Sequence, residues 1–253
     1  LLLEAGTQSQ SAVEQSLRDQ ETCHDSASYN QFDIPLYWSA AASSHRRDYH
    51  WPIELLGKAV GGSGLLNAMI YIRSLESDWN TWNITGWDYE TVLKEYKALE
   101  DYHGDYATNR RGKNGPIVTS VPLITDTVAQ LFIKSAVNAG FKETPNFNEK
   151  RLGVGHYEFN VRHGLRDSVA AAYLGRAAVP KNLHIETGVT VTRLLLLGVA
   201  ERSRAAKSRA IGVEYVQDSR IGQFIVKEAG GEVILSAGAI LTPQLLANSG
   251  IEG

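Results

Sequence analysis

Residues 57–82 read GKAVGGSGLLNAMIYIRSLESDWNTW and say most about the fold of this chain. Gly61 and Gly62 lack a Cβ, so the backbone can turn sharply there and a ligand can approach it closely. The residues that follow are expected to form a helix whose first amide groups point toward an anion such as a pyrophosphate. A Gly-Gly-Ser turn alone is more often an ordinary loop before a helix, because glycine is common in turns of every kind. The longer pattern is more specific, because Asn67 and Arg73 follow at fixed intervals.

A second stretch with a readable local structure lies near the other end, at residues 231–251, GEVILSAGAILTPQLLANSGI. The continuous apolar run of residues 233–235 is typical of a strand covered on both faces. Thr242 is a suitable N-cap, Pro243 suits the first helical position and Gly250 can end the helix. A strand, a turn of small residues and a helix let a cofactor touch backbone at the carboxyl end of the strand. A crossover that binds no ligand has the same pattern.

The chain opens with the apolar run LLL, followed by Glu4, Ala5 and Gly6. This pattern predicts a short strand that ends in an acid and a glycine. In a dinucleotide-binding unit, an acid at the end of the second strand accepts hydrogen bonds from the adenosine ribose. A buried strand with a solvated glutamate at its tip would have the same sequence, so both interpretations stay open at this point.

Taken together, these motifs resemble the two signatures of the glucose-methanol-choline (GMC) flavin oxidoreductases. Residues 57–82 match the first signature at nearly every fixed position, apart from Ser74, where the family usually has Gly, Ala or Pro. Residues 231–251 match the second signature, apart from Glu252, which follows directly and replaces a final glycine. Two softer similarities to family segments lie between them, at residues 164–174 and 182–196.

The resemblance implies a mixed α/β (α+β) fold with an incomplete FAD-binding Rossmann-type domain, part of a substrate domain and an inserted antiparallel β-meander. Residues 1–82 would form the first part of the FAD-binding domain, residues 83–163 part of the substrate-binding domain and residues 164–253 the second part of the FAD-binding domain. Family members also carry a G-x-G-x-x-G turn before the position of Glu4 and a histidine-containing catalytic segment after that of Gly253. The resemblance therefore implies that the chain is an internal fragment of a family member.

The resemblance also assigns FAD as the cofactor and places it on particular residues. Glu4 would hold the ribose, the backbone of Val191 would meet the adenine, and Ala237 would lie near the pyrophosphate. The residues expected to run beside the pyrophosphate and the flavin are Gly62, Ser63, Asn67, Ala68, Met69 and Ile70. Core packing of a strand is the other interpretation of Val191, and both can hold at once.

The activity that the resemblance implies is the oxidation of an alcohol, with a hydride passing from the CH–OH carbon to flavin N5. The alcohol would be a small molecule such as choline, a sugar or another primary alcohol. The electron acceptor is left open, so an oxidase and a dehydrogenase are both allowed. A hydroxynitrile lyase and a fatty-acid photodecarboxylase are alternatives within the family, and a truncated, non-catalytic remnant is an alternative of another class. We assign no catalytic residue, because none of the 7 histidines falls in a segment like the family's catalytic one.

The composition argues against several other classes of protein. A net charge of −3 gives no reason to expect nucleic acid or an anionic membrane surface as a partner. Cys23 is the single cysteine, which excludes an internal disulfide, and its neighbourhood lacks the ligand spacing of a zinc site. No apolar stretch approaches the roughly 20 residues of a transmembrane segment. No targeting segment is visible, so the compartment is left open.

Between and after these motifs, the pattern predicts two helices and several strands. Residues 88–100 form an amphipathic helix capped by Asp88, residues 117–119 a short strand and residues 125–139 a second helix. The side chains expected to face the core from the second helix are Val128, Leu131, Phe132 and Ser135. The strands that belong to the expected meander region are residues 184–187, 189–197, 211–216 and 224–227.

Overall fold

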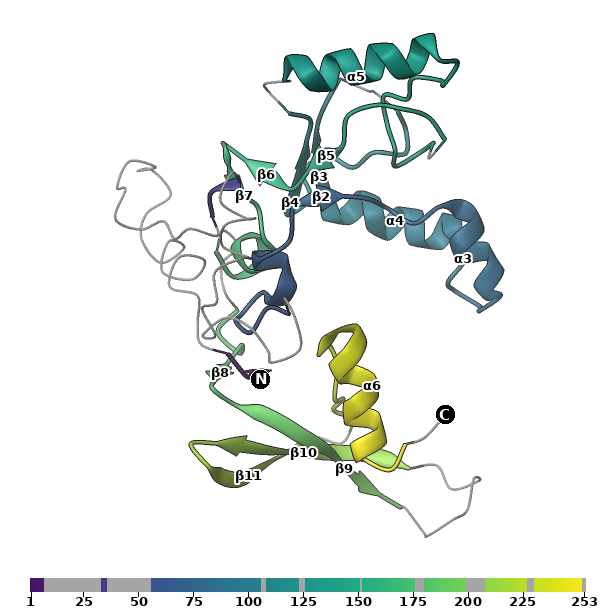
Figure 1. The fold of residues 1–253 in the computed structure, drawn as a ribbon. Helices are drawn as coiled ribbons and strands as arrows, with labels where there is room; N and C mark the ends of the chain where they lie inside the picture. Colours follow the sequence, from purple (N-terminus) through teal and green to yellow (C-terminus); the bar gives the residue numbers. More distant parts are fainter. Residues whose placement is uncertain are drawn as a thin grey trace. The chain divides into compact units, whose positions relative to one another are not determined.

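The computed structural model describes residues 1–6, 33–35, 56–105, 108–122, 126–150, 152–175, 180–198, 208–226 and 230–251. The chain divides into two compact units, and Figure 1 labels most of their helices and strands. The first unit contains residues 1–8, 58–60 and 180–253, and the second contains residues 9–57 and 61–179. Both units combine helices with strands, so the mixed α/β class that the sequence predicts is confirmed.

The first unit is built on two small sheets. β1 (Leu2–Glu4) pairs in parallel with β8 (Ile185–Thr187), so the apolar run at the start of the chain is a strand, as predicted. β9 (Thr190–Leu197), β10 (Arg209–Gln217) and β11 (Arg220–Ile225) form an antiparallel meander in the order β11-β10-β9. The predicted meander is thus confirmed, although β8 pairs with β1 and lies outside it.

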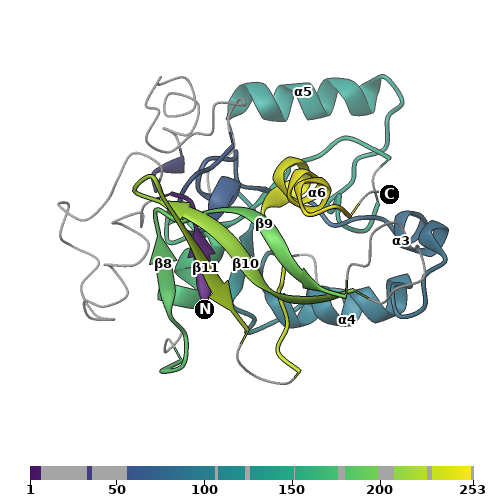
Figure 2. The same cartoon turned by 90° about the horizontal axis from the view of Figure 1, so that it is seen from below.

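Helix α6 (Gly238–Asn248) packs against β9 of the meander, as Figure 2 shows. Ser249, which follows the helix, accepts a hydrogen bond at its Oγ from the backbone N–H of Leu194 in β9 (2.8 Å). Gly250 has a φ angle of 77° and follows the last helical turn, as its sequence position predicts. The helix is therefore tied to the sheet at its C-terminal end.

Two predictions about the segment that contains α6 are wrong. Residues 231–236 form no strand, and Ile234 is 82% exposed. A strand covered on both faces requires neighbours, and none of the described residues pairs with this segment. The helix begins at Gly238, so Thr242 is not its N-cap and Pro243 lies inside it. Ala239 and Leu241 are good helix formers, and the helix starts upstream of the proline at the loss of one backbone hydrogen bond.

The second unit contains a four-stranded sheet in the order β2-β5-β4-β3. β5 (Glu158–Phe159) pairs antiparallel with both β2 (Ile70–Tyr71) and β4 (Ile117–Ser120). β3 (Glu100–His103) pairs with β4 in parallel. A short hairpin of β6 (Val161–Arg162) and β7 (Leu165–Arg166) follows β5 and leads to a single π-helical turn, Ala171–Gly175.

Two helices directly precede β3 in the described part of the chain. α3 (Glu76–Trp82) is followed by α4 (Tyr89–Leu99), which runs directly into the strand. The side chain of Asp88 accepts a hydrogen bond from the N–H of Thr91 (3.0 Å), so the predicted cap of α4 is confirmed. Leu93 is buried on the inner face of this helix. The amphipathic pattern of the sequence therefore predicted the position of this helix correctly.

A further helix of the second unit, α5 (Thr127–Asn138), begins after its cap, Asp126. The prediction that its apolar side chains face inward is wrong, because Val128, Leu131 and Phe132 are 70%, 57% and 67% exposed. Periodicity shows that a helix has an apolar face but not what covers it. None of the described residues covers this face of α5.

The centre of the second unit is a buried cluster of four charged side chains, each exposed by 2% or less. Glu100, the first residue of β3, binds Arg73 (2.6 Å) and Arg111 (2.6 Å). Arg111 also donates to both carboxylate oxygens of Glu158 in β5 (2.9 and 2.8 Å). Burial alone would lower the pKa of Arg111, but its bonds to the two glutamates outweigh this effect and raise it. Two positive and two negative charges are thus buried together and balanced.

The two compact units do not coincide with the three predicted domain segments, because residues 61–82 and 164–179 belong to the second unit. The predicted boundaries divide the chain by the ligand that each part would bind, whereas the units divide it by compactness. The division into FAD-binding and substrate-binding parts therefore stays a prediction.

Arg111→Met should lower the free energy of unfolding by about 3–5 kcal/mol, because it leaves the buried carboxylate of Glu158 without its arginine and Glu100 with Arg73 alone. Urea denaturation measures this loss. Arg193→Met is the matched control, because the Arg193–Glu214 pair lies at the surface with the arginine side chain 51% exposed. Equal losses in the two variants would contradict a structural role for the buried cluster.

Candidate functional site

The glycine-rich turn starts with the backbone that its sequence predicts. Gly61 and Gly62 have φ angles of 107° and 56°, in the left-handed region that glycine adopts without strain. A Cβ on Gly62 would find no atom within 4 Å, so the space beside this residue is open. The helix predicted to follow is only a single 3₁₀ turn, Gly62–Leu65, because the chain becomes extended at Ile70 and enters β2.

Met69 holds the far end of this turn in an unusual conformation. It is a buried, non-glycine residue with a φ angle of 61°, which is strained for a side chain of this size. Its N–H donates to Oδ1 of Asn67 (3.0 Å), and its carbonyl accepts from the N–H of Asn160 (2.8 Å). Such strain persists only where surrounding bonds over-determine it, and it is concentrated at functional sites.

The other predicted residues of the turn are accessible to different degrees. Ser63 is exposed, and its Oγ accepts a hydrogen bond from the N–H of Gly57 (3.0 Å). Ala68 is half-buried, and Ile70 is 41% exposed. Asn67 is exposed, with its amide oxygen turned back toward the protein. The turn therefore presents both backbone and polar side chains at its surface.

Arg166 joins the turn from the β6–β7 hairpin, and sequence reasoning missed it. Its Nη1 donates to the carbonyl of Gly64 (3.1 Å) and to Oδ1 of Asn67 (2.8 Å). Burial lowers the pKa of Arg166 to about 10, although the nearby charge of Asp33 acts in the opposite direction. The bond to Asn67 spans 99 positions of sequence, so no local pattern could have predicted it.

Glu4 ends β1 in the first unit, where it is half-buried. Burial raises the pKa of its carboxyl, and this effect exceeds the opposing effects of the Gly6 and Ala5 amides and of Lys58. The Gly6 N–H donates to Oε1 of Glu4 (2.8 Å). The backbone next to Glu4 thus holds the carboxylate at the end of the strand. In this position the carboxylate can accept further hydrogen bonds.

Val191 and Ala237 also lie in the first unit. Val191 is half-buried in β9, opposite Tyr215 of β10. The N–H of Val189, just before β9, donates to the carbonyl of Glu4 (3.0 Å), so Glu4 and Val191 lie on adjoining parts of one unit. Ala237 is the exposed N-cap residue of α6.

The predicted site residues therefore fall into two groups. The structure brings Gly62, Ser63, Asn67, Ala68, Met69 and Ile70 together in one turn of the second unit. Glu4, Val191 and Ala237 belong to the first unit. Their assignment to parts of one cofactor stays a prediction.

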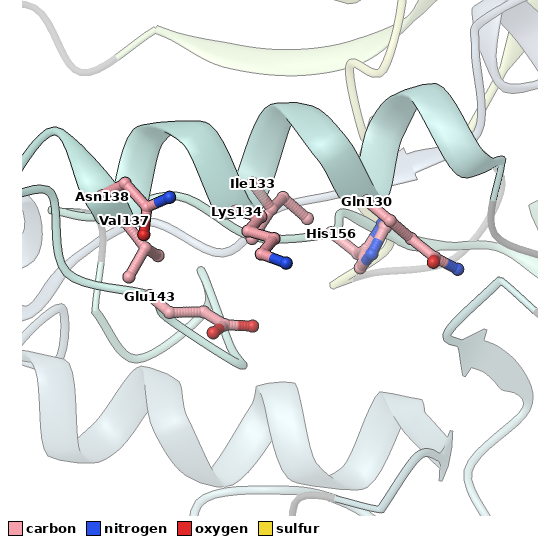
Figure 3. A pocket seen from close by; sticks show the side chains of 7 residues that line it. All are labelled: Gln130, Ile133, Lys134, Val137, Asn138, Glu143 and His156. Carbon is pink, nitrogen blue, oxygen red and sulfur yellow. The ribbon is translucent and has the colours of Figure 1, made fainter.

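Figure 3 shows a separate pocket of about 310 Å³ in the second unit. Lys134 of α5 points into the space between this helix and the segment that carries Glu143 and His156. The other lining residues are Gln130, Ile133, Val137 and Asn138. No predicted site residue lines this pocket, so it is distinct from the glycine-rich turn.

Neither a metal site nor a membrane span emerges from the described part of the chain. It contains no group of three His, Cys, Asp or Glu residues arranged to hold a metal ion. Its helices are all too short or too polar to cross a bilayer.

Comparison with known proteins gives one consistent result. The profile of the GMC oxidoreductase family matches residues 39–253. Mitochondrial choline dehydrogenase of Mus musculus is 36% identical over 209 residues, which cover 81% of this chain and 32% of that protein. Oxygen-dependent choline dehydrogenase of Staphylococcus aureus (strain MSSA476) is 36% identical over 201 residues, covering 77% and 33%. Alcohol dehydrogenase (acceptor) of Pseudomonas putida is 32% identical over 211 residues, covering 82% and 36%.

Solved structures agree with the sequence comparisons. Pyridoxine 4-oxidase from Mesorbium loti superimposes with a TM-score of 0.77 at 26% identity, over 99% of this chain and 46% of that one. An FAD-dependent oxidoreductase from Chaetomium thermophilum gives a TM-score of 0.75 at 20% identity, over 98% and 43%, and this likeness concerns the fold alone. The chain spans about a third of the length of the curated relatives it matches.

Glu4→Gln should raise the thermal unfolding temperature at neutral pH. The folded chain keeps the Glu4 proton to a higher pH than the unfolded chain does, so this carboxyl lowers stability as the pH rises from its ordinary pKa of 4.5 through the raised value. The gap between variant and wild type should therefore close as the pH falls below 4.5.

Unfolding temperatures measured across this pH range check the expectation. Glu232→Gln is the control, because Glu232 is an exposed carboxylate of the same unit. A wild type that is more stable than Glu4→Gln at neutral pH would show that the buried carboxylate is not destabilising.

Proposed function

The chain belongs to the GMC oxidoreductase family, and we propose from this premise that it forms part of the FAD site of an alcohol oxidoreductase. The observation that carries the proposal is the turn at residues 61–70. The turn is open at Gly62, where a Cβ would meet nothing within 4 Å, and it is clamped in a strained conformation at Met69. A backbone held open and rigid in this way fits a large planar or anionic cofactor that approaches closely.

The side chains near the turn also fit FAD. The exposed amide of Asn67 offers hydrogen-bond donors, and the positive charge of Arg166 lies behind it. Gly62 and Ser63 would run beside the pyrophosphate with Asn67, and the backbone from Ala68 onward beside the flavin. In this assignment, the protein contributes fixed donors to a cofactor rich in acceptor oxygens.

The residues of the first unit would hold the other half of the cofactor. The half-buried carboxylate of Glu4 would accept hydrogen bonds from the ribose hydroxyls, as an acid at this position of a dinucleotide-binding unit does. Its pKa is raised by burial, so its charge is costly without a ligand and gains from donors that arrive with one. Val191 would meet the adenine through its backbone, and Ala237 would adjoin the pyrophosphate.

FAD, when bound, accepts the hydride that leaves the carbon of an alcohol. The residues of this chain would bind the cofactor and fix its orientation. We assign the proton acceptor to none of the histidines, because none lies in a segment similar to the family's catalytic one; of the described histidines, His103 pairs with Asp101 and His184 with Glu186. The contribution that we propose for the described residues is thus cofactor binding.

The proposed substrate is a small alcohol. The matched relatives are named as choline dehydrogenases and an alcohol dehydrogenase. A donor with a CH–OH group is the feature that these activities share. The electron acceptor is left open, since these names include both oxygen-dependent and acceptor-dependent enzymes.

Gly62→Ala should weaken FAD binding by about tenfold or more, because a Cβ would occupy the space beside the turn. Gly86→Ala is the matched control. Gly86 also has a positive φ angle, 83°, and open space around its Cβ position, but it lies in the loop between α3 and α4. Both variants carry similar backbone strain, so only Gly62→Ala should change the FAD dissociation constant, measured by titrating apoprotein and following flavin fluorescence. Equal affinities in the wild type and Gly62→Ala would remove the turn from the cofactor site.

The activity is tested on the full-length gene product that contains residues 1–253. Purified protein should show the visible absorption of bound flavin, and anaerobic addition of choline or a simple primary alcohol should bleach it. A colourless protein that takes up no added FAD would overturn the cofactor assignment. A flavin that no alcohol reduces would overturn the assignment of the reaction.

A further inference from the structure

The side-chain amide of Asn67 can adopt only one of its two orientations. Its Oδ1 lies 2.8 Å from Nη1 of Arg166 and 3.0 Å from the backbone N of Met69. Both partners are donors with no acceptor capacity, so each requires an oxygen opposite it, and the flipped amide would place donors against donors. The oxygen of Asn67 is therefore fully engaged with the protein.

The nitrogen of the same amide, in contrast, is not engaged with the described residues. Asn67 is exposed, and its Nδ2 makes no hydrogen bond with the described residues. Its two N–H groups are thus available at the surface of the open turn. A ligand that meets Asn67 at this surface encounters donors only.

We propose that Arg166 is a positioning residue that holds Asn67 so that only hydrogen-bond donors face the cofactor. The group of FAD at this point is then an acceptor, either an atom of the isoalloxazine ring or an oxygen of the pyrophosphate. The inference rests on the proposed function, and it adds the polarity of one contact and the residue that sets it. Arg166 acts through Asn67 and does not itself touch FAD.

The geometry of Arg166 suits this task. The same Nη1 donates to the carbonyl of Gly64 (3.1 Å), so a single nitrogen fixes both the backbone of the turn and the side chain that it presents. Arg166 is only 6% exposed, and a guanidinium held in place by packing loses little rotamer freedom when it forms these bonds. A charged donor also makes stronger hydrogen bonds than a neutral one.

Asn67→Asp tests the polarity of the contact, because it changes the group that faces the ligand while keeping the bonds behind it. A carboxylate accepts hydrogen bonds from Arg166 and Met69 as well as the amide does, so the turn should be retained. Its outward oxygen is an acceptor with a negative charge, so the FAD dissociation constant should rise about tenfold or more. Asn109→Asp, at an exposed asparagine, is the control with the same chemical change. Unchanged FAD affinity in Asn67→Asp would overturn the inference.

Titration with ADP locates the acceptor. ADP carries the pyrophosphate but no flavin ring. If Asn67→Asp weakens ADP and FAD by the same factor, the acceptor is a pyrophosphate oxygen, and if it weakens FAD alone, the acceptor lies on the isoalloxazine. Both results support a contact through donors.

Arg166 variants test the positioning role. Arg166→Met should weaken FAD binding several-fold, and Arg166→Lys, which keeps a charged donor, should recover part of the loss. In an Asn67→Ala background, Arg166→Met should cause a smaller further loss of FAD affinity than it causes in the wild type, because only its bond to Gly64 is then left to lose. Full additivity of the two changes, or no rescue by lysine, would show that Arg166 only supports the fold.

Thermal unfolding of the FAD-free protein separates this inference from the proposed function. Arg166→Met should lower the unfolding temperature by roughly 2–4 °C, and the double variant with Asn67→Ala should lose less than the sum of the single losses. If the wild type binds no FAD but this coupling is present, the proposed function fails and Arg166 still orients Asn67. Additive losses overturn the inference whether or not FAD binds.

Discussion

The buried cluster of Arg73, Glu100, Arg111 and Glu158 is the constraint on which the second unit depends. Removing a charge from water costs several kcal/mol unless a partner compensates it, so the four side chains can be buried only in an arrangement that pairs them all. Glu100 lies in β3 and Glu158 in β5, on either side of β4, and Arg111 binds both. Thr119 of β4 also donates to Glu100 (2.9 Å). The charges therefore fix the order and register of a sheet whose strands are too short to specify it by themselves.

This constraint extends to the proposed cofactor turn. Arg73 follows β2 by two residues, and its bond to Glu100 holds the end of that strand. Arg166 holds the other end of the turn through Gly64 and Asn67. Between these anchors, Met69 keeps a left-handed backbone that costs of order 1–3 kcal/mol. These two anchors thus hold the strained backbone of the turn that we propose to face FAD.

Local patterns predicted what depends on local interactions. The cap and length of α4 and the meander of β9, β10 and β11 were readable, because capping and alternation act over a few residues. The start of α6, the strand expected before it and the buried face expected for α5 were wrong, since each depends on which other elements are adjacent. The role of Arg166 was invisible for the same reason. Resemblance to a family identified the residues of the turn, but the hydrogen bonds that orient them could be found only in three dimensions.

A crystal structure of the full-length protein with FAD bound would show directly which atoms surround the Asn67 amide. We expect Nδ2 to lie within roughly 3 Å of an acceptor atom of FAD while Oδ1 keeps its bonds to Arg166 and Met69. An FAD that lies elsewhere, or a turn in which Asn67 directs its oxygen toward the cofactor, would contradict it.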